Sequence, residues 1–201
     1  ESIPLVELEL PLILRVILAR RGLSEVAKAS EYINPSPPPN PLDHFPQLGK
    51  AVRRLVVACN KNEKVAICGD YDADGMTSTA LLTRVLKEMG AKVIPLIPSR
   101  LKEGYGLNTS MVDNLHIEGV TLIITVDNGI NATEAINAIR KKSIDLIITD
   151  HHILQTEIPK VFSLLHPITT PKDSPYRDLA GVGLAYILAN QLIKQDKASL
   201  D

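Results

Sequence analysis

The chain has 201 residues, of which 45% are hydrophobic, and it carries a formal net charge of −1 at pH 7. This length and composition suit one large domain, or one domain with an accessory segment, and exclude a chain too polar to form a core. The small net charge excludes a general electrostatic attraction to nucleic acid, so any polyanion must be held by local clusters of Arg and Lys.

The first 33 residues contain two short apolar or amphipathic segments, at 4–20 and 24–32. The stretch 3–18 is the most apolar of the chain, but charged residues and a proline interrupt it. It also lacks the charged start and the small-residue cleavage site of a signal peptide. We therefore expect a packed helix or strand there and no association with a membrane.

A proline-rich stretch follows. Residues 34–41 hold five of the fourteen prolines, which neither a helix nor a central strand can accept. Beyond this stretch the pattern changes to a regular alternation of β-rich and helical segments. We therefore predict three parts: an accessory segment at 1–33, a linker at 34–42 and a domain at 43–201.

The domain predicted at 43–201 shows alternating strands and helices. Helices are predicted at 45–61, 76–89, 108–117, 131–142 and 182–194, and strands at 64–69, 92–97, 120–126, 144–149 and 161–165. The strands at 120–126 and 144–149 are nearly continuous runs of apolar, β-forming residues, which is typical of strands covered on both faces. The order predicts an α/β fold with a doubly wound, mainly parallel sheet of five strands and helices on both faces.

The two cysteines, Cys59 and Cys68, fall in a predicted helix and a predicted buried strand. They form no CxxC pair and have no histidine at the spacing of a zinc site. We therefore expect buried, reduced thiols and a cytoplasmic location.

Acidic residues and histidines follow most of the predicted strands. In chain order the residues behind the strands are Asp70, Asp72 and Asp74; Ser99 and Arg100; Asp127; Asp150, His151 and His152; and His166. In open α/β sheets, ligands bind beyond the carboxyl ends of the strands, so one site that collects these side chains is expected. Carboxylates with imidazoles suit Mn²⁺ or Mg²⁺, and the donors suffice for two ions about 3.5–4 Å apart, an arrangement used in phosphoryl transfer.

Single residues of this set also have structural explanations. Asp70 or Asp74 could cap the helix that starts near Met76, and the triplet at 127–129 is an ordinary turn signal. The triplet Asp-His-His at 150–152 is different, because it offers little to a hydrophobic core. Its position favours a site, and it supports the same interpretation for the other acids.

The spacing of the three acids at 70–74 also matches the first half of an EF-hand calcium loop. Position 12 of such a loop would be Leu81, where a bidentate Glu is required. The residues before Asp70 form a predicted strand, whereas an EF-hand loop follows a helix. The calcium interpretation is therefore rejected.

Three motifs, in order and spacing, resemble the DHH phosphoesterase superfamily: Asp-Tyr-Asp-Ala-Asp-Gly at 70–75, Val-Asp-Asn-Gly at 126–129 and Asp-His-His at 150–152. Within it the chain resembles the RecJ family of single-strand-specific 5′-to-3′ DNA exonucleases. Arg100 with the segment 103–107, and the segment 176–185, add to this resemblance, which runs from about residue 43 to the end.

The resemblance implies a ligand set for two Mn²⁺ or Mg²⁺ ions: Asp72, Asp74, Asp127 and His151, with Asp127 bridging the ions. It implies that Asp70 and Asp150 are supporting carboxylates that orient the ligands. It also implies that His152 faces the scissile phosphate and donates to its developing charge.

The resemblance further implies contacts with the substrate from Arg100, Tyr105 and Gly106. Gly181 and Gly183 open a predicted helix, so their N–H groups could meet another phosphate. Close helix packing explains these two glycines nearly as well.

The family places a further Asp ligand after another helix and strand, followed by a second domain with a Gly-Gly-His motif that grips nucleic acid. The chain stops at Asp201, so we expect the amino-terminal part of a longer enzyme of DNA repair and recombination. Its expected partners are single-stranded DNA and a DNA-repair helicase or single-strand-binding protein.

Other functions stay open at this point. One is a DHH phosphodiesterase of small or cyclic dinucleotides, and another is a non-catalytic fragment that binds metal and nucleotide. A pyrophosphatase is disfavoured, because that group begins its first motif with a His ligand and the residues around Asp70 supply none.

Overall fold

The computed structural model describes residues 5–98, 106–155 and 157–198. The chain divides into two compact units, Glu1–Pro39 and Asn40–Asp201. Within the described residues, no helix combines the length and the apolar character needed to cross a lipid bilayer.

The first unit contains helices α1 (Leu12–Arg20) and α2 (Val26–Ile33). A small core of Leu5, Leu18 and Ala29 joins them. The apolar stretch at 3–18 is thus helical in part, and a helix was one of the two structures expected there.

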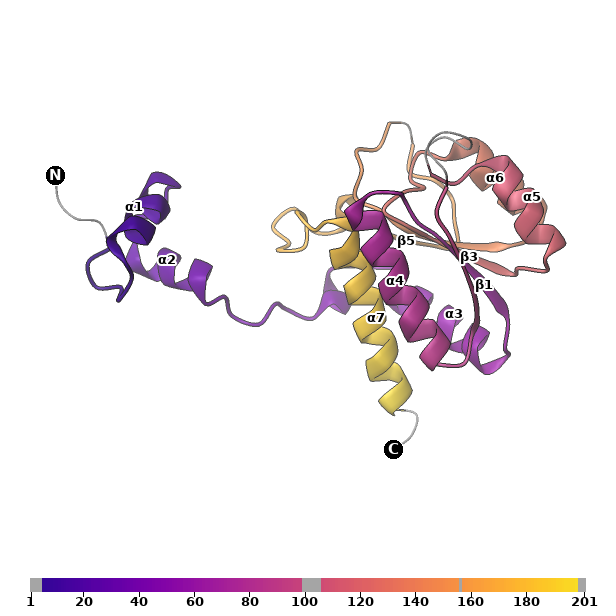
Figure 1. Cartoon of the computed structure of the whole chain (residues 1–201), viewed down its shortest axis with the longest axis horizontal. Helices are drawn as coiled ribbons and strands as arrows, with labels where there is room; N and C mark the ends of the chain where they lie inside the picture. Colours follow the sequence, from indigo (N-terminus) through magenta and orange to yellow (C-terminus); the bar gives the residue numbers. More distant parts are fainter. Residues whose placement is uncertain (1–4, 99–105, 156, 199–201) are drawn as a thin grey trace. The chain divides into compact units, whose positions relative to one another are not determined.

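The second unit is built on an all-parallel sheet of five strands in the order β2-β1-β3-β4-β5 (Figure 1). The strands are β1 (Lys64–Cys68), β2 (Lys92–Leu96), β3 (Leu122–Val126), β4 (Asp145–Thr149) and β5 (Ser163–Leu165). The central strand β3 is fully buried, as its continuous apolar sequence predicts. The predicted α/β class and the number of strands are confirmed.

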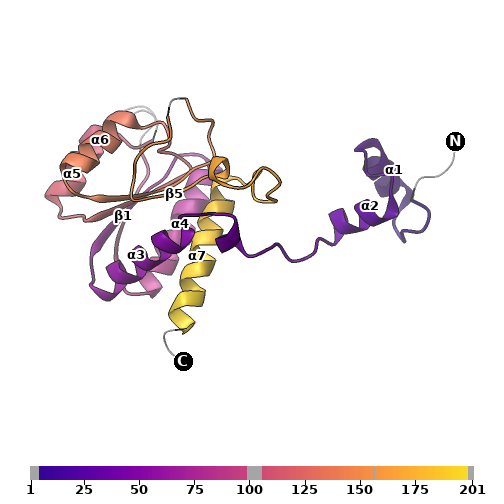
Figure 2. The same ribbon diagram turned by 180° about the vertical axis from the view of Figure 1, so that it is seen from behind.

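Helices cover both faces of this sheet (Figures 1 and 2). One face carries α3 (Leu48–Asn60), α4 (Ala73–Glu88) and α7 (Gly181–Ala198), and the other carries α5 (Thr109–Ile117) and α6 (Thr133–Lys141). Two short 3-10 helices, η1 (Pro41–Asp43) and η2 (Pro167–Thr169), also belong to this unit.

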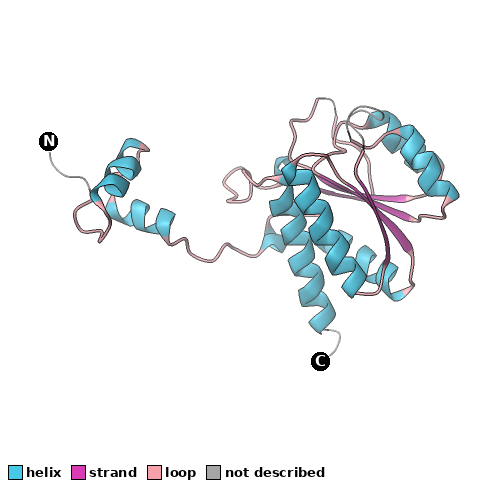
Figure 3. Cartoon of the chain, in the orientation of Figure 1, coloured by secondary structure: helices cyan, strands magenta, loops and turns pink. Residues whose placement is uncertain are grey.

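Alternate residues of each strand supply the two cores. On β3, Leu122 and Ile124 point to the α3/α4/α7 side, whereas Ile123 packs with α5 and α6. Cys59 and Cys68 are buried thiols, and burial raises the pKa of Cys68 to about 12. Because the two cores bury the strands on both faces, the strands anchor the loops at the carboxyl edge of the sheet (Figure 3).

At the opposite edge of the sheet, Arg54 joins two acids. Its Nη2 donates to Glu63 at 2.7 Å and its Nε to Asp145 at 2.6 Å. Burial opposes the charge of Arg54, but the two carboxylates raise its pKa. This cluster ties α3 to the starts of β1 and β4.

One helix starts earlier than predicted. Helix α4 begins at Ala73 rather than at residue 76, because Asp72 is its N-cap and accepts from the N–H of Gly75 at 2.9 Å. The cap is thus neither Asp70 nor Asp74, the two residues considered for that role. Asp74 lies in the first turn of α4, where a negative charge is favourable.

Candidate metal centre

The loop between β1 and α4 supplies three carboxylates at different depths. Asp70 is buried, with 3% of its surface exposed, and its Oδ1 accepts from the N–H of Tyr71 at 2.7 Å. Asp72 is exposed and caps α4. Asp74 is half-buried and lies in the first turn of α4.

Helix α7 holds Asp74 in place. The N–H of Gly181 donates to Oδ2 of Asp74 at 2.7 Å, and the N–H of Val182 donates to Oδ1 at 2.6 Å. These N–H groups lie at the positive end of the helix and have no partner within it, so they stabilise the carboxylate. Asp74 is therefore oriented by two residues that lie 107 and 108 positions later in the sequence.

This contact corrects one expectation about the glycines. The N–H of Gly181 meets a carboxylate of the chain rather than a phosphate, and that of Gly183 donates to Ala180 at 3.0 Å. Close packing explains both residues: a Cβ on Gly181 would lie 2.8 Å from the Cβ of Asp127, and one on Gly183 would lie 3.0 Å from Leu179.

Asp127 lies at the middle of the centre. It directly follows β3, is 1% exposed and has a φ of 61°. A residue other than glycine in this left-handed region is uncommon and concentrates at functional sites. Its Oδ1 lies 3.0 Å from Nε2 of His151, which is in turn 3.5 Å from Oδ2 of Asp74.

Asp150 organises the two histidines. Its Oδ1 accepts from the N–H groups of His151 at 2.7 Å and His152 at 3.1 Å, and lies 2.8 Å from the ring Nδ1 of His152. Its Oδ2 accepts from the N–H of Ile130 at 2.9 Å. Asp150 is 1% exposed, so this buried carboxylate is satisfied by hydrogen bonds, as burial requires.

His166, the histidine behind β5, is a support and not part of the centre. Its Nε2 donates to the carbonyl of His152 at 2.9 Å, and its Nδ1 accepts from the N–H of Ile168 at 3.0 Å. Burial lowers its pKa, in keeping with a neutral ring. Both ring nitrogens are bonded to backbone, so His166 holds the turn at His152.

Asn128 is a second support that the sequence did not single out. Its buried side chain donates to the carbonyls of Cys68 at 3.0 Å and Val126 at 2.9 Å, and accepts from the N–H of Leu107 at 3.3 Å. It therefore joins the ends of β1 and β3 to the segment before α5. In the sequence, Asn128 belongs to a turn signal and to the motif at 126–129, and neither assigns it this role.

The charges in the centre favour a cation. Burial, together with the neighbouring carboxylates of Asp74 and Asp72, raises the pKa of Asp127 to about 7. For His152, burial lowers the pKa, but the hydrogen bond to Asp150 and the nearby negative charges raise it above its ordinary value. A divalent ion would relieve this repulsion, and the residues present fit it.

Two groups of donors converge closely enough to hold an ion. One is formed by Asp127, His151 and His152, and the other by Asp70, Asp72 and Asp127, with ligand atoms within 4.8 Å of one another in each group. Asp127 belongs to both groups. Oxygen and imidazole donors without thiolate are typical of Mn²⁺ or Mg²⁺ sites.

Apart from Gly181 and Gly183, the predicted site residues therefore divide into three sets. The structure brings together Asp70, Asp72, Asp74, Asp127, Asp150, His151 and His152 at the carboxyl edge of the sheet. Gly106 lies near this edge beside a pocket. Arg100 and Tyr105 lie outside the described residues.

Comparison with known proteins gives concordant matches. The family model described as "DHH family, N-terminal domain" matches residues 64–201. The single-stranded-DNA-specific exonuclease RecJ of Bacillus subtilis is 37% identical over 88% of this chain and 23% of its own length. RecJ of Escherichia coli is 36% identical over 90% of this chain and 31% of its own length.

Solved structures agree with these matches. A crystal structure of exonuclease RecJ bound to manganese is 35% identical, with a TM-score of 0.69 over 75% of this chain and 38% of that chain. RecJ of Thermus thermophilus in complex with Mn²⁺ is 30% identical, with a TM-score of 0.71 over 93% of this chain and 26% of that chain. The chain thus spans less than half the length of these relatives.

Proposed function

The chain belongs to the DHH family, and on that premise we propose that it carries the metal-binding part of an enzyme that hydrolyses phosphodiester bonds. The observation that carries this proposal is the meeting of acids and histidines from β1, β3 and β4 around Asp127. Its relatives are single-strand-specific DNA exonucleases. We therefore assign single-stranded DNA as the substrate and 5′-to-3′ removal of nucleotides as the reaction.

Asp72, Asp74, Asp127 and His151 would hold two Mn²⁺ or Mg²⁺ ions. Bound ions of this kind stabilise the charge on a phosphoryl group and supply a hydroxide nucleophile at neutral pH. Asp127 belongs to both groups of donors, which supports its role as a ligand. Asp74 is oriented by the N–H groups of α7, and such orientation of a ligand raises the affinity of a site.

His152 would donate a proton or hydrogen bond to the phosphate. Asp150 contacts its Nδ1 and so fixes the orientation of the ring. The raised pKa of His152 keeps the ring protonated to a higher pH, and a cationic donor binds an anionic oxygen more strongly than a neutral one. The backbone bond from His166 fixes the turn that carries this ring.

We extend the proposal to the cellular role. Removal of single strands from 5′ ends belongs to DNA repair and recombination, and a helicase or a single-strand-binding protein is the kind of partner that would present such strands. The two buried thiols support a reducing compartment, so we assign the cytoplasm.

The test compares four substrates in the presence of Mn²⁺: 5′-labelled single-stranded DNA, duplex DNA, a dinucleotide and pyrophosphate. We expect nucleotides to be released from the single strand, and Asp127→Ala to lower the rate by at least about 100-fold. Asp173→Ala, which replaces an exposed acid outside the centre, is the matched control. Cleavage of the dinucleotide but never of long strands would contradict the exonuclease assignment, and full activity of Asp127→Ala would contradict the metal mechanism.

A further inference from the structure

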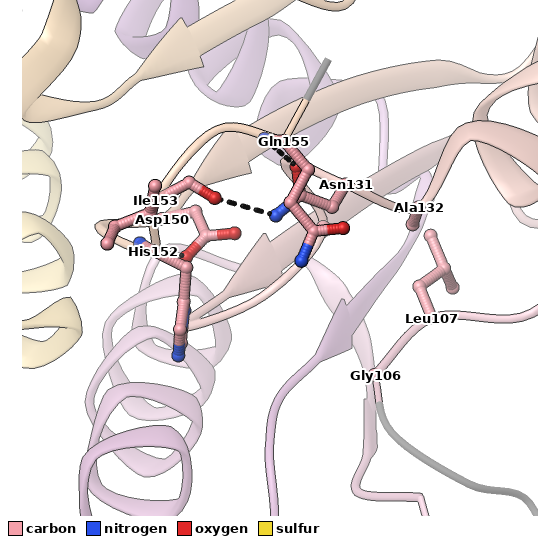
Figure 4. Close-up of a pocket in the computed structure, with 9 residues that line it drawn as sticks. Gly106, Leu107, Asn131, Ala132, Asp150, His152, Ile153 and Gln155 are labelled. Atoms are coloured by element: carbon pink, nitrogen blue, oxygen red, sulfur yellow. Dashed lines mark hydrogen bonds and ion pairs between the residues drawn. The ribbon is translucent and has the colours of Figure 1, made fainter.

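A pocket of about 630 Å³ lies directly beside His152. Figure 4 shows Leu107 and Ala132 on one side of it and Ile153 with His152 on the other, with Asn131 between them. The loops after β3 and β4 and the segment before α5 thus form its walls. Its volume lies in the range of sites for small molecules, which is about 300–1,000 Å³.

The pocket is close to electrically neutral, unlike the acidic centre next to it. Among the described residues that line it, Asp150 is the one acid, and it already accepts hydrogen bonds from three backbone N–H groups and contacts the ring of His152. No Lys or Arg is among the lining residues that the structure describes. His152 also lines the pocket and is the lining residue assigned to the phosphate, so a neutral group attached to that phosphate would fit the rest of the pocket.

One apolar side chain in the wall is left open to solvent. Ile153 is 87% exposed, although it directly follows His152. Ala132 is half-buried and presents apolar surface that is fixed in place, whereas Leu107 is buried and adds little exposed surface. A flat, partly apolar group between Ile153 and these residues would remove this surface from water.

A carboxamide supplies the polar part of the wall and keeps it in shape. Nδ2 of Asn131 donates to the carbonyl of Ile153 at 3.0 Å, and its Oδ1 accepts from the N–H of Gln155 at 2.9 Å. Through these hydrogen bonds, Asn131 joins the loop after His152 to the loop after β3. Gln155 adds a second, exposed carboxamide to the lining.

We propose that this pocket binds the nucleoside joined to the scissile phosphate, with its base against Ile153 and its polar edge toward Asn131 and Gln155. The inference rests on the proposed function and adds the position of the base to it. Contact through an aliphatic face and adaptable carboxamides tolerates any base, so the subsite recognises the presence of a base rather than its identity.

Binding is tested first without metal and without cleavage. In the full chain with labelled isoleucine δ1-methyl groups, thymidine should shift the Ile153 resonance more than inorganic phosphate does, because phosphate meets His152 and leaves the apolar wall uncovered. Ile117, which is 82% exposed at the end of α5, is the matched control and should respond to neither probe. An Ile153 resonance that ignores thymidine would overturn the inference.

Kinetics supply the second readout. Removal of the base from the nucleotide at the cleavage site should raise KM about tenfold in the unaltered protein, with little change in kcat. Ile153→Ser should reduce that difference to less than about threefold, Ile153→Leu should restore it, and Ile117→Ser should leave it unchanged. An equal KM ratio in all four proteins, with cleavage intact, would refute the pocket alone. Absence of cleavage on every substrate would refute the proposed function instead.

Discussion

Replacing Asp127 by Asn in the metal-free protein removes one negative charge from the most crowded part of the centre. The side chain keeps its size, and its Oδ1 can still accept from His151, which lies 3.0 Å away in the unaltered protein. The change therefore isolates the electrostatic cost of the carboxylate. We expect Asp127→Asn to be more stable than the unaltered chain at pH 8 without metal.

The magnitude follows from the pKa. Asp127 is raised from an ordinary value near 3.8 to about 7, which at 1.36 kcal/mol per pH unit gives an upper bound of about 4 kcal/mol. Solvent reaches the neighbouring ring of His151, whose side chain is 33% exposed, and screens part of the repulsion, so we expect about 2 kcal/mol.

The sign of the pH dependence follows from proton binding. Between pH 4 and pH 7 the folded chain keeps the proton on Asp127 while the unfolded chain has lost it, so stability falls as the pH rises. The advantage of Asp127→Asn should therefore be near zero at pH 4, grow up to pH 7 and stay constant above it.

The assay is urea unfolding followed by far-ultraviolet circular dichroism, because the chain contains no tryptophan. Mn²⁺ should reverse the order of stabilities, since an ion that binds only the folded state stabilises the unaltered protein more than the variant. The reasoning is refuted if the free energy of unfolding of Asp127→Asn does not exceed that of the unaltered chain at pH 8 without metal. It is also refuted if the difference between the two free energies does not change with pH.

Three further changes, one of them with a matched control, test other parts of the structure. Asp150→Asn should lower the pKa of His152, which Asp150 raises against the effect of burial, and should slow cleavage about 10- to 100-fold. The alkaline limb of the pH–rate profile should then move to lower pH. Gly181→Ala should cost about 1–3 kcal/mol in urea unfolding, because its Cβ would lie 2.8 Å from a side chain of the centre. Gly49→Ala, inside α3 and 3.3 Å from a flexible guanidinium, should be neutral or stabilising by up to about 1 kcal/mol. Arg54→Met should cost about 2–4 kcal/mol, because two carboxylates lose their partner, while leaving Mn²⁺ affinity, measured by calorimetry, unchanged.

The strands and their positions along the chain could be predicted from the sequence because their signals are local. A buried parallel strand is a short apolar run, and the acids that follow such runs share one edge by the rules of parallel sheets. The start of α4 was missed for a local reason too. Three acids at alternating positions all resemble caps, and only the backbone geometry selects Asp72.

The contact that orients Asp74 is long-range, and no sequence pattern encodes it. The bond between Asp74 and Gly181 joins residues 107 positions apart, and it depends on where α7 packs against α4. For the same reason the glycines of α7 could be placed at a helix start but not assigned a partner. For His166, the sequence predicted the position behind β5. It did not predict that both ring nitrogens form hydrogen bonds with backbone groups.

Backbone N–H groups hold most of the acids of the centre in place. Asp70, Asp72, Asp74 and Asp150 each accept a hydrogen bond from at least one backbone N–H. Such fixed dipoles compensate buried negative charge without a mobile counterion. Asp127 lies against the ring of His151 and among these carboxylates, and burial together with the neighbouring negative charges raises its pKa to about 7. It is also the residue shared by both groups of donors. A cation that neutralises Asp127 gains affinity from the relief of that repulsion, so metal binding is coupled to folding through this residue.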